Sequence, residues 1–190
     1  ILLVMLSAAY TIGLEWKRDT QLVLYRISGK SPLTALVGKL LPQTLVFWLI
    51  YILYAVYFYR YLQYPCNSGI MAMILVGMLT VLGAQGFAAF LFGVCGQMRL
   101  SMCLCSLWGI LSFSLAGFTF PVTAMDTILQ KLCVVFPLRH YYLLYVNQAL
   151  NGYSIVYVWH SVLALAIFAL LPLLTLHHYR RLFINVKYIP

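Results

Sequence analysis

The amino-acid sequence predicts an all-α protein, a polytopic bundle of helices that crosses a membrane several times. Hydrophobic residues make up 64% of the 190 residues and charged residues only 8%, whereas soluble domains have about 45–50% and about 25%. A chain of this size has too little interior to hide so much apolar surface from water. Its apolar runs also have the length of about 20 residues that a helix needs to cross a bilayer.

One partial span and four complete spans fit this length. The partial span is residues 1–14, and the complete spans are residues 40–59, 70–95, 102–120 and 155–176. None of the four complete spans contains Asp, Glu, Lys or Arg. Each is expected to be a helix, because backbone polar groups in lipid must pair within their own segment and the runs lack the alternation of a barrel strand.

Positive charge predicts the orientation of the chain. Most Lys and Arg residues lie in residues 15–39, at Arg99 or in residues 177–190, whereas the opposite face has only Arg60, Lys131 and Arg139. By the positive-inside rule the first group is cytoplasmic, so residues 177–190 are expected to form a cytoplasmic tail. Loops that face an anionic membrane surface account for the net charge of +9, so no nucleic-acid partner is expected.

The cytoplasmic connection, residues 15–39, is long enough to hold a helix. It combines charges with an apolar run over residues 21–27, which is followed by Ser28, Gly29 and Pro32. We expect an amphipathic helix that lies along the inner membrane surface.

The outer connection, residues 121–154, predicts a helical hairpin. Asp126 is a suitable N-cap, Pro137 interrupts the helical pattern, and Asn151 and Gly152 end it. We therefore expect two short helices between the fourth and fifth spans.

A stripe of small residues follows one face of the span at residues 70–95. Its members are Gly86, Ala89, Gly93 and Gly96, with Gln85 at its edge. Small residues at this spacing let helices approach closely, so helix packing is expected. The alternative is that Gln85 contacts a transported molecule or a second subunit.

Residues that could carry chemistry do not form a catalytic or metal-binding pattern. The string SGKS at Ser28 resembles the end of a phosphate-binding loop, but the first glycine is replaced by Leu24. His160 and His177 are too far apart along one helix to share a metal ion. The cysteines lack zinc-site spacing, and a disulfide between Cys66 and Cys133 is left open.

The predicted spans also lack the carboxylates and bases that ion-coupled transporters and lipid-modifying enzymes use. Glu15, Asp19 and Asp126 are the only acidic residues, and all three lie in connections. We therefore expect no enzyme activity. If the chain moves a molecule across the membrane, the free energy must come from a partner.

The cytoplasmic connection resembles a segment of type-2 ATP-binding-cassette (ABC) exporter permeases. That segment reads approximately E-R-E-x-G-T-x-E-x-L, followed by G-K-x-x-P. The matching residues are Glu15, Arg18, Thr20, Leu22, Gly38, Lys39 and Pro42. Asp19 stands where the family usually has glycine.

The outer connection is similar to the final outer region of the same family. The matching residues are Gly117, Phe120, Pro121, Met125, Pro137, His140, Tyr141 and Gly152. The order of the spans agrees if residues 1–14 are the end of the family's second span. The resemblance therefore identifies the chain as a fragment that covers roughly the second to sixth spans.

The resemblance implies an exporter permease in the inner membrane of a bacterium, with a cytoplasmic C-terminus. ATP and Mg would be bound by a cytoplasmic ATP-binding subunit, a second permease would complete a homodimer or heterodimer, and this chain would hold no cofactor. The expected contacts with the ATPase subunit are Glu15, Arg18, Thr20, Gln21 and Leu22. The expected outer gate consists of Phe120, Pro121, Pro137, His140 and Tyr141.

An amphipathic or lipid-like molecule is the expected substrate. The same architecture is shared by permeases for polysaccharide or teichoic-acid chains, which are one alternative. A membrane scaffold that transports nothing and uses the stripe of small residues for assembly is the other.

Overall fold

The computed structural model describes residues 1–118, 121–153 and 155–185, and every regular element in these ranges is a helix. The predicted all-α class is confirmed. Helices long and apolar enough to cross a membrane cover Pro32–Tyr61, Ile70–Cys95, Met98–Leu115 and Val156–Phe183.

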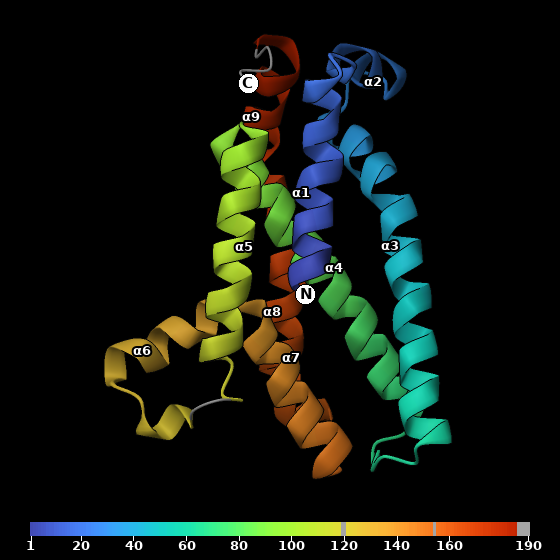
Figure 1. Cartoon of the computed structure of the whole chain (residues 1–190), viewed down its shortest axis with the longest axis vertical. Helices are drawn as coiled ribbons and strands as arrows, with labels where there is room; N and C mark the ends of the chain where they lie inside the picture. The colour runs from blue at the N-terminus through green and yellow to red at the C-terminus, as the bar shows by residue number, and fades with distance from the viewer. Residues whose placement is uncertain (119–120, 154, 186–190) are drawn as a thin grey trace.

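The first half of the chain runs back and forth along the long axis of the molecule (Figure 1). It forms α1 (Leu2–Lys17), α2 (Gln21–Ile27), α3 (Pro32–Val56) with the π-helical turn η1 (Tyr57–Tyr61), α4 (Ile70–Cys95) and α5 (Met98–Leu115). Figure 1 shows α2 and the turn between α4 and α5 near one end of the molecule, which we call the α2 end. The helix η1 lies at the opposite end.

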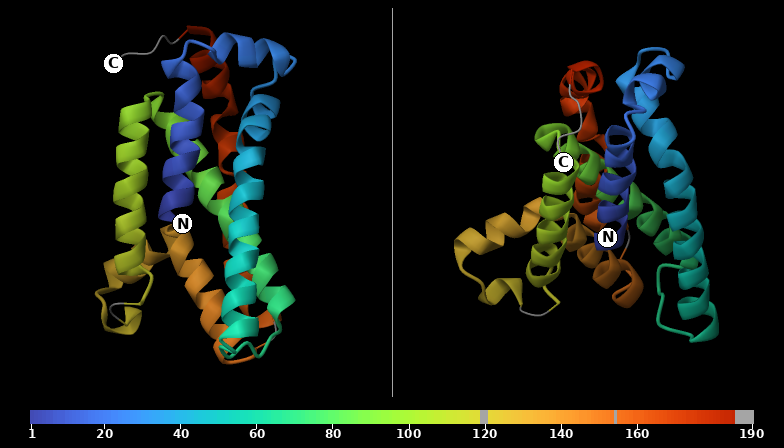
Figure 2. Two further views of the ribbon diagram at one scale, coloured as in Figure 1. Left: turned by 45° about the vertical axis from the view of Figure 1, so that its right-hand side comes forward. Right: turned by 45° about the horizontal axis from the view of Figure 1, so that its top comes forward.

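The second half begins with the outer hairpin and returns to the α2 end. It forms α6 (Thr127–Leu132), η3 (Cys133–Val135), α7 (Pro137–Tyr145), η4 (Val146–Leu150), α8 (Trp159–Leu170) and α9 (Pro172–Asn185). Figure 2 shows α6 and α7 away from the α2 end and α9 close to it. We call the end with η1 and α7 the hairpin end. The segments with most of the Lys and Arg residues therefore lie at the α2 end, and the segments with few of them lie at the hairpin end.

The centre of the bundle is α4, which contacts α1, α3, α5, α7, α8 and α9. Its stripe of small residues faces the last two helices. A Cβ atom at Gly86 would lie 2.5 Å from the carbonyl oxygen of Phe168, and one at Gly93 would lie 2.7 Å from Thr175 Oγ1. The stripe therefore packs helices within the chain.

The C-terminal segment corrects one expected boundary. Residues 177–185, expected as the start of a tail, continue α9 and bury Tyr179 and Phe183. The Tyr179 hydroxyl donates to the Ala89 carbonyl at 2.6 Å, and the Phe183 ring lies 5.0 Å from that of Trp16. The basic residues hide this apolar face in the sequence, because Tyr179, Leu182 and Phe183 recur at helical spacing between them.

Prolines and glycines set the other boundaries that differ from expectation. Pro32 occupies the first turn of α3, so this helix begins before residue 40. The expected span 155–176 is divided, because Pro172 has no N–H to continue the helix. The span expected at 102–120 begins at Met98 and ends at Leu115, and Gly117 then adopts φ +102°.

The outer hairpin forms as expected. Asp126 caps α6 and accepts a hydrogen bond from the Thr127 N–H at 2.8 Å. Phe136 and Pro137 separate the two halves, and Gly152 ends the second half with φ +67°. Cys66 and Cys133 are both free, so the disulfide that the sequence left open is absent.

Candidate functional site

The loop that carries α2 is held in place by an acidic side chain. Glu15, in the last turn of α1, forms an ion pair with Lys39 of α3 and accepts a hydrogen bond from the Thr20 hydroxyl. Burial raises the pKa of the Glu15 carboxyl, but the hydrogen bonds and the charges of Lys39 and Arg18 outweigh it, and the net pKa is below its ordinary value. The carboxylate therefore stays ionised at neutral pH and ties α1 to α3.

The helix α2 has one buried and one exposed face. Gln21 and Tyr25 are buried, and the Tyr25 ring stacks on Phe183 with centroids 5.5 Å apart. On the other side Val23 is exposed and Ile27 is 80% exposed. At the α2 end, therefore, some apolar side chains of α2 are exposed and are not part of the core of the bundle.

The residues expected to contact an ATPase subunit fall into two groups. Arg18, Thr20 and Leu22 are exposed, whereas Glu15 is largely covered and Gln21 is buried. Val23 and Ile27 are also exposed on α2 and were not among the expected contacts. The signal was present, because these two apolar residues lie one turn apart and away from the buried positions 21 and 25.

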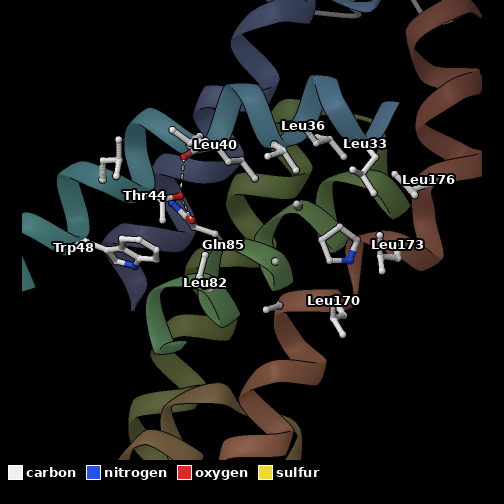
Figure 3. Close-up of a pocket in the computed structure, with 17 residues that line it drawn as sticks. Leu33, Leu36, Leu40, Thr44, Trp48, Leu82, Gln85, Leu170, Leu173 and Leu176 are labelled. Atoms are coloured by element: carbon white, nitrogen blue, oxygen red, sulfur yellow. Dashed lines mark hydrogen bonds between the residues drawn. The ribbon is translucent and has the colours of Figure 1, made fainter. Parts of the chain in front are cut away.

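An apolar groove of about 540 Å³ lies between α3, α4 and the junction of α8 and α9 (Figure 3). Leucines from all three sides line it, among them Leu36, Leu82 and Leu173. The α3 side also contributes Val37 and Leu45, which are exposed. Exposed apolar residues beside the groove are expected to face lipid, so it opens toward the bilayer.

Gln85 lines this groove and has one polar atom without a hydrogen-bond partner among the described residues. The Thr44 hydroxyl, which has a single proton to donate, lies 2.7 Å from Gln85 Oε1 and 2.9 Å from the Leu40 carbonyl. Gln85 is 3% exposed, and its Nε2 has no partner among the described residues. If the amide is turned over, Nε2 pairs with Thr44 and Oε1 becomes the unpaired atom. In either orientation the amide has at least one hydrogen bond left to offer a ligand.

The predicted residues of the small-residue stripe divide between the groove and the core. Gly86 and Ala89 line the groove together with Gln85. Gly93 and Gly96 do not line it and pack under α9 instead, where Cβ atoms would meet Thr175 and Leu182. The structure thus brings only the first half of the stripe to the groove.

The expected outer gate is partly ordered by His140. Its Nε2–H donates to the Val134 carbonyl at 2.8 Å, across the break at Pro137. The Tyr141 hydroxyl lies 3.4 Å from that of Tyr51 on α3. Pro121 precedes a 3₁₀ turn at Val122–Ala124, and Phe120 lies outside the described residues.

Acidic pH is expected to loosen this hairpin. Burial lowers the pKa of His140, as does nearby Arg139, although the hydrogen bond to Val134 raises it, and the net pKa is below the ordinary value. As the pH falls below about 6.5, the unfolded segment therefore takes up a proton before the folded one, and stability is lost.

Hydrogen–deuterium exchange in the peptide over residues 127–136 is expected to speed up between pH 7.5 and pH 5.5, after correction for the intrinsic rate. His140→Gln keeps an N–H donor without the titration and should remove this difference. His160→Gln, at the exposed start of α8, should retain it. Equal exchange in the unaltered protein at both pH values would contradict the role of His140.

In the part of the chain that the structure describes, no group of three or more His, Cys, Asp or Glu side chains could hold a metal ion. The polar atoms of the groove and of the α2 loop can bind and position other groups. These features define a polytopic helical membrane protein with an apolar groove and an exposed apolar surface at one end.

The family model described as "ABC-2 family transporter protein" matches residues 1–176, so the chain belongs to this family. It is a membrane permease, a transmembrane subunit without catalytic activity of its own, and permeases of this family function with ATPase subunits. Searches of curated proteins and of solved structures find no significant match. The resemblance found in the sequence is thereby confirmed.

Proposed function

We propose that the chain is the permease subunit of an ATP-driven exporter that moves an amphipathic or lipid-like molecule across the inner membrane of a bacterium. A separate cytoplasmic subunit binds ATP and Mg, and a second permease, identical or different, completes the transporter. The observation that carries the substrate class is the apolar groove with the Gln85 amide, one polar atom of which has no partner among the described residues.

The α2 end is the cytoplasmic side in this proposal, and the exposed face of α2 docks the ATPase subunit. Leu22, Val23 and Ile27 supply the apolar contact, and Arg18 and Thr20 lie beside them. Glu15 and Gln21 support this face from inside. A patch of exposed apolar side chains is typical of a surface that a partner covers, and Arg is enriched in such interfaces.

The groove favours a lipid-like substrate over a polysaccharide. Its lining is almost entirely aliphatic, and Thr44 and Gln85 bring the only side-chain hydroxyl and amide among its described residues. An acyl chain fits such a surface, and one polar group on it would pair with Gln85. A sugar chain would leave most of its hydroxyls without partners, at a cost for each buried group.

The test uses the full-length protein and its ATPase subunit in liposomes, with a fluorescent lysophospholipid as the probe. ATP turnover is expected to rise with the probe. Gln85→Leu should raise the probe concentration for half-maximal stimulation by about fivefold to tenfold, which corresponds to a hydrogen bond of about 1–1.4 kcal/mol.

Thr80→Val is the matched control. Thr80 is buried on the same helix, donates to the Val76 carbonyl of that helix at 2.8 Å and does not line the groove. This variant should respond to the probe like the unaltered protein. Equal responses of Gln85→Leu and the unaltered protein would contradict the substrate site, and purification without any ATPase subunit would favour the scaffold.

A further inference from the structure

A second pocket, of about 340 Å³, lies at the hairpin end and is lined almost entirely by aromatic rings. Nine of its ten described lining residues are aromatic, and seven of these are tyrosines. Tyr51, Tyr54 and Tyr59 come from α3 and η1, and Tyr141, Tyr142 and Tyr145 come from α7. Figure 2 shows that the ends of α3 and α7 that line the pocket both point away from the α2 end. We call this site the tyrosine pocket.

Most phenol groups of the tyrosine pocket are unpaired. The Tyr51 hydroxyl donates to the Met73 carbonyl at 3.1 Å and lies 3.4 Å from the Tyr141 hydroxyl. The lining contains five other tyrosines. The rings of Tyr54, Tyr64 and Tyr142 contact neighbouring aromatic rings. No hydrogen bond joins the hydroxyls of these five tyrosines to other described residues. No acidic side chain and no amide occurs among the lining residues that the structure describes.

This lining fits a quaternary ammonium group. The faces of aromatic rings attract a cation, and cages of such rings are the usual way to bind a quaternary ammonium, which has no N–H to satisfy. A primary amine or a sugar needs acceptors and donors in greater number, and carboxylates and amides are absent from the described lining. The composition of the pocket therefore favours the quaternary ammonium over both.

Arg139 lies beside the pocket, because its Nη1 and Cε1 of the lining residue Tyr142 would both lie within 3.4 Å of a Cβ atom at Gly117. Together with Arg60, which neighbours a lining residue in the sequence, it indicates that the ligand also carries an anion. Arg60 follows Tyr59 in η1 and is exposed. Arg139 lies in α7 two residues before Tyr141, and its Nη1 donates to the Ala116 carbonyl at 3.2 Å. These guanidinium groups would repel a bare cation, but they suit a zwitterion whose phosphate accepts hydrogen bonds from Arg.

We propose that the tyrosine pocket binds a phosphocholine group, with the quaternary ammonium among the rings and the phosphate toward Arg60 or Arg139. Tyrosines at the end of a membrane span lie at the level of lipid headgroups. The ligand is therefore either the headgroup of a membrane lipid or a free phosphocholine compound. This binding site is independent of the substrate groove and of the proposed export activity.

Ligand-observed NMR tests the proposal on the full-length protein in nanodiscs of phosphatidylglycerol, which contain no choline. The probes are phosphocholine, dihexanoylphosphatidylcholine and 3,3-dimethylbutyl phosphate, a neutral-headed isostere of phosphocholine. Saturation transfer to the N-methyl protons is expected, with at least about tenfold weaker binding of the isostere. Binding of both choline probes indicates recognition of the headgroup itself, and binding of the lipid alone assigns the site to membrane lipid. Equal binding of the isostere overturns the proposal.

Matched variants show whether the rings of this pocket are responsible. Tyr54→Leu and Tyr142→Leu should each weaken binding about tenfold, and Tyr54→Phe and Tyr142→Phe should restore it because they keep the ring. Tyr57→Leu is the control, since Tyr57 is exposed beside the pocket without lining it. An equal loss in Tyr57→Leu, or no loss in the two pocket variants, overturns the proposal. Thermal unfolding of each variant separates loss of binding from loss of fold.

Discussion

Gly86→Ala is expected to destabilise the helical bundle by about 1–3 kcal/mol, the usual cost of an extra methyl group in a packed core. The added Cβ would lie 2.5 Å from the Phe168 carbonyl oxygen and 2.7 Å from Ala169 Cα. Both are backbone atoms of α8, which cannot rotate out of the way as the end of a side chain can. The two helices must therefore move apart, and the contact between α4 and α8 is loosened along its length.

Gly38→Ala is the matched control for this prediction. Gly38 also lies inside a helix, but a Cβ there would meet none of the described atoms within 4 Å. This variant should be as stable as the unaltered protein or more stable by up to about 1 kcal/mol, because Ala favours the helix over Gly. Thermal unfolding in detergent, followed by intrinsic fluorescence, measures both. If Gly86→Ala melts with the unaltered protein, α4 and α8 are not in the described contact.

The pairing of α4 with α8 and α9 shows how far the sequence could be interpreted. The spacing of small residues identified the face of α4 that packs closely, because the helical period fixes which residues share a face. It could not identify the partner, since a stripe of small residues accepts any helix of suitable shape. The partner depends on long-range contacts such as the hydrogen bond from Tyr179 to Ala89.

Helix boundaries were predictable where a local signal marks them. The span at residues 70–95 coincides with α4, because Gly69 and Gly96 flank it and both adopt positive φ. The C-terminal end of α9 was missed because hydropathy counts the basic residues without regard to the face they occupy. The sequence did not predict the groove, since α3, α4 and α8 meet there only in the folded chain. Of its lining, the sequence indicated Gln85 with its neighbours Gly86 and Ala89.

Ile27→Glu is expected to weaken docking of the ATPase subunit at least about thirtyfold, which is the loss of an interface hot spot worth about 2 kcal/mol. Ile27 is 80% exposed on α2, so the substitution breaks no contact in the core of this chain. In the docked complex the carboxylate would lose its hydration against an apolar partner surface, and the desolvation of a charge is costly. ATP turnover by the reconstituted transporter should fall to the rate of the isolated ATPase subunit.

Ile128→Glu separates this effect from a general response to charge. Ile128 is 75% exposed on α6, so the same substitution at similar exposure falls on the outer hairpin, far from α2. Copurification of the ATPase subunit and ATP turnover should be unchanged in this variant, while membrane insertion should be the same in both. Equal losses in the two variants would mean that added charge alone disturbs the protein. Full ATPase docking by Ile27→Glu would show that the exposed face of α2 is not where the subunits meet. The ATPase subunit would then have to contact another part of the α2 end.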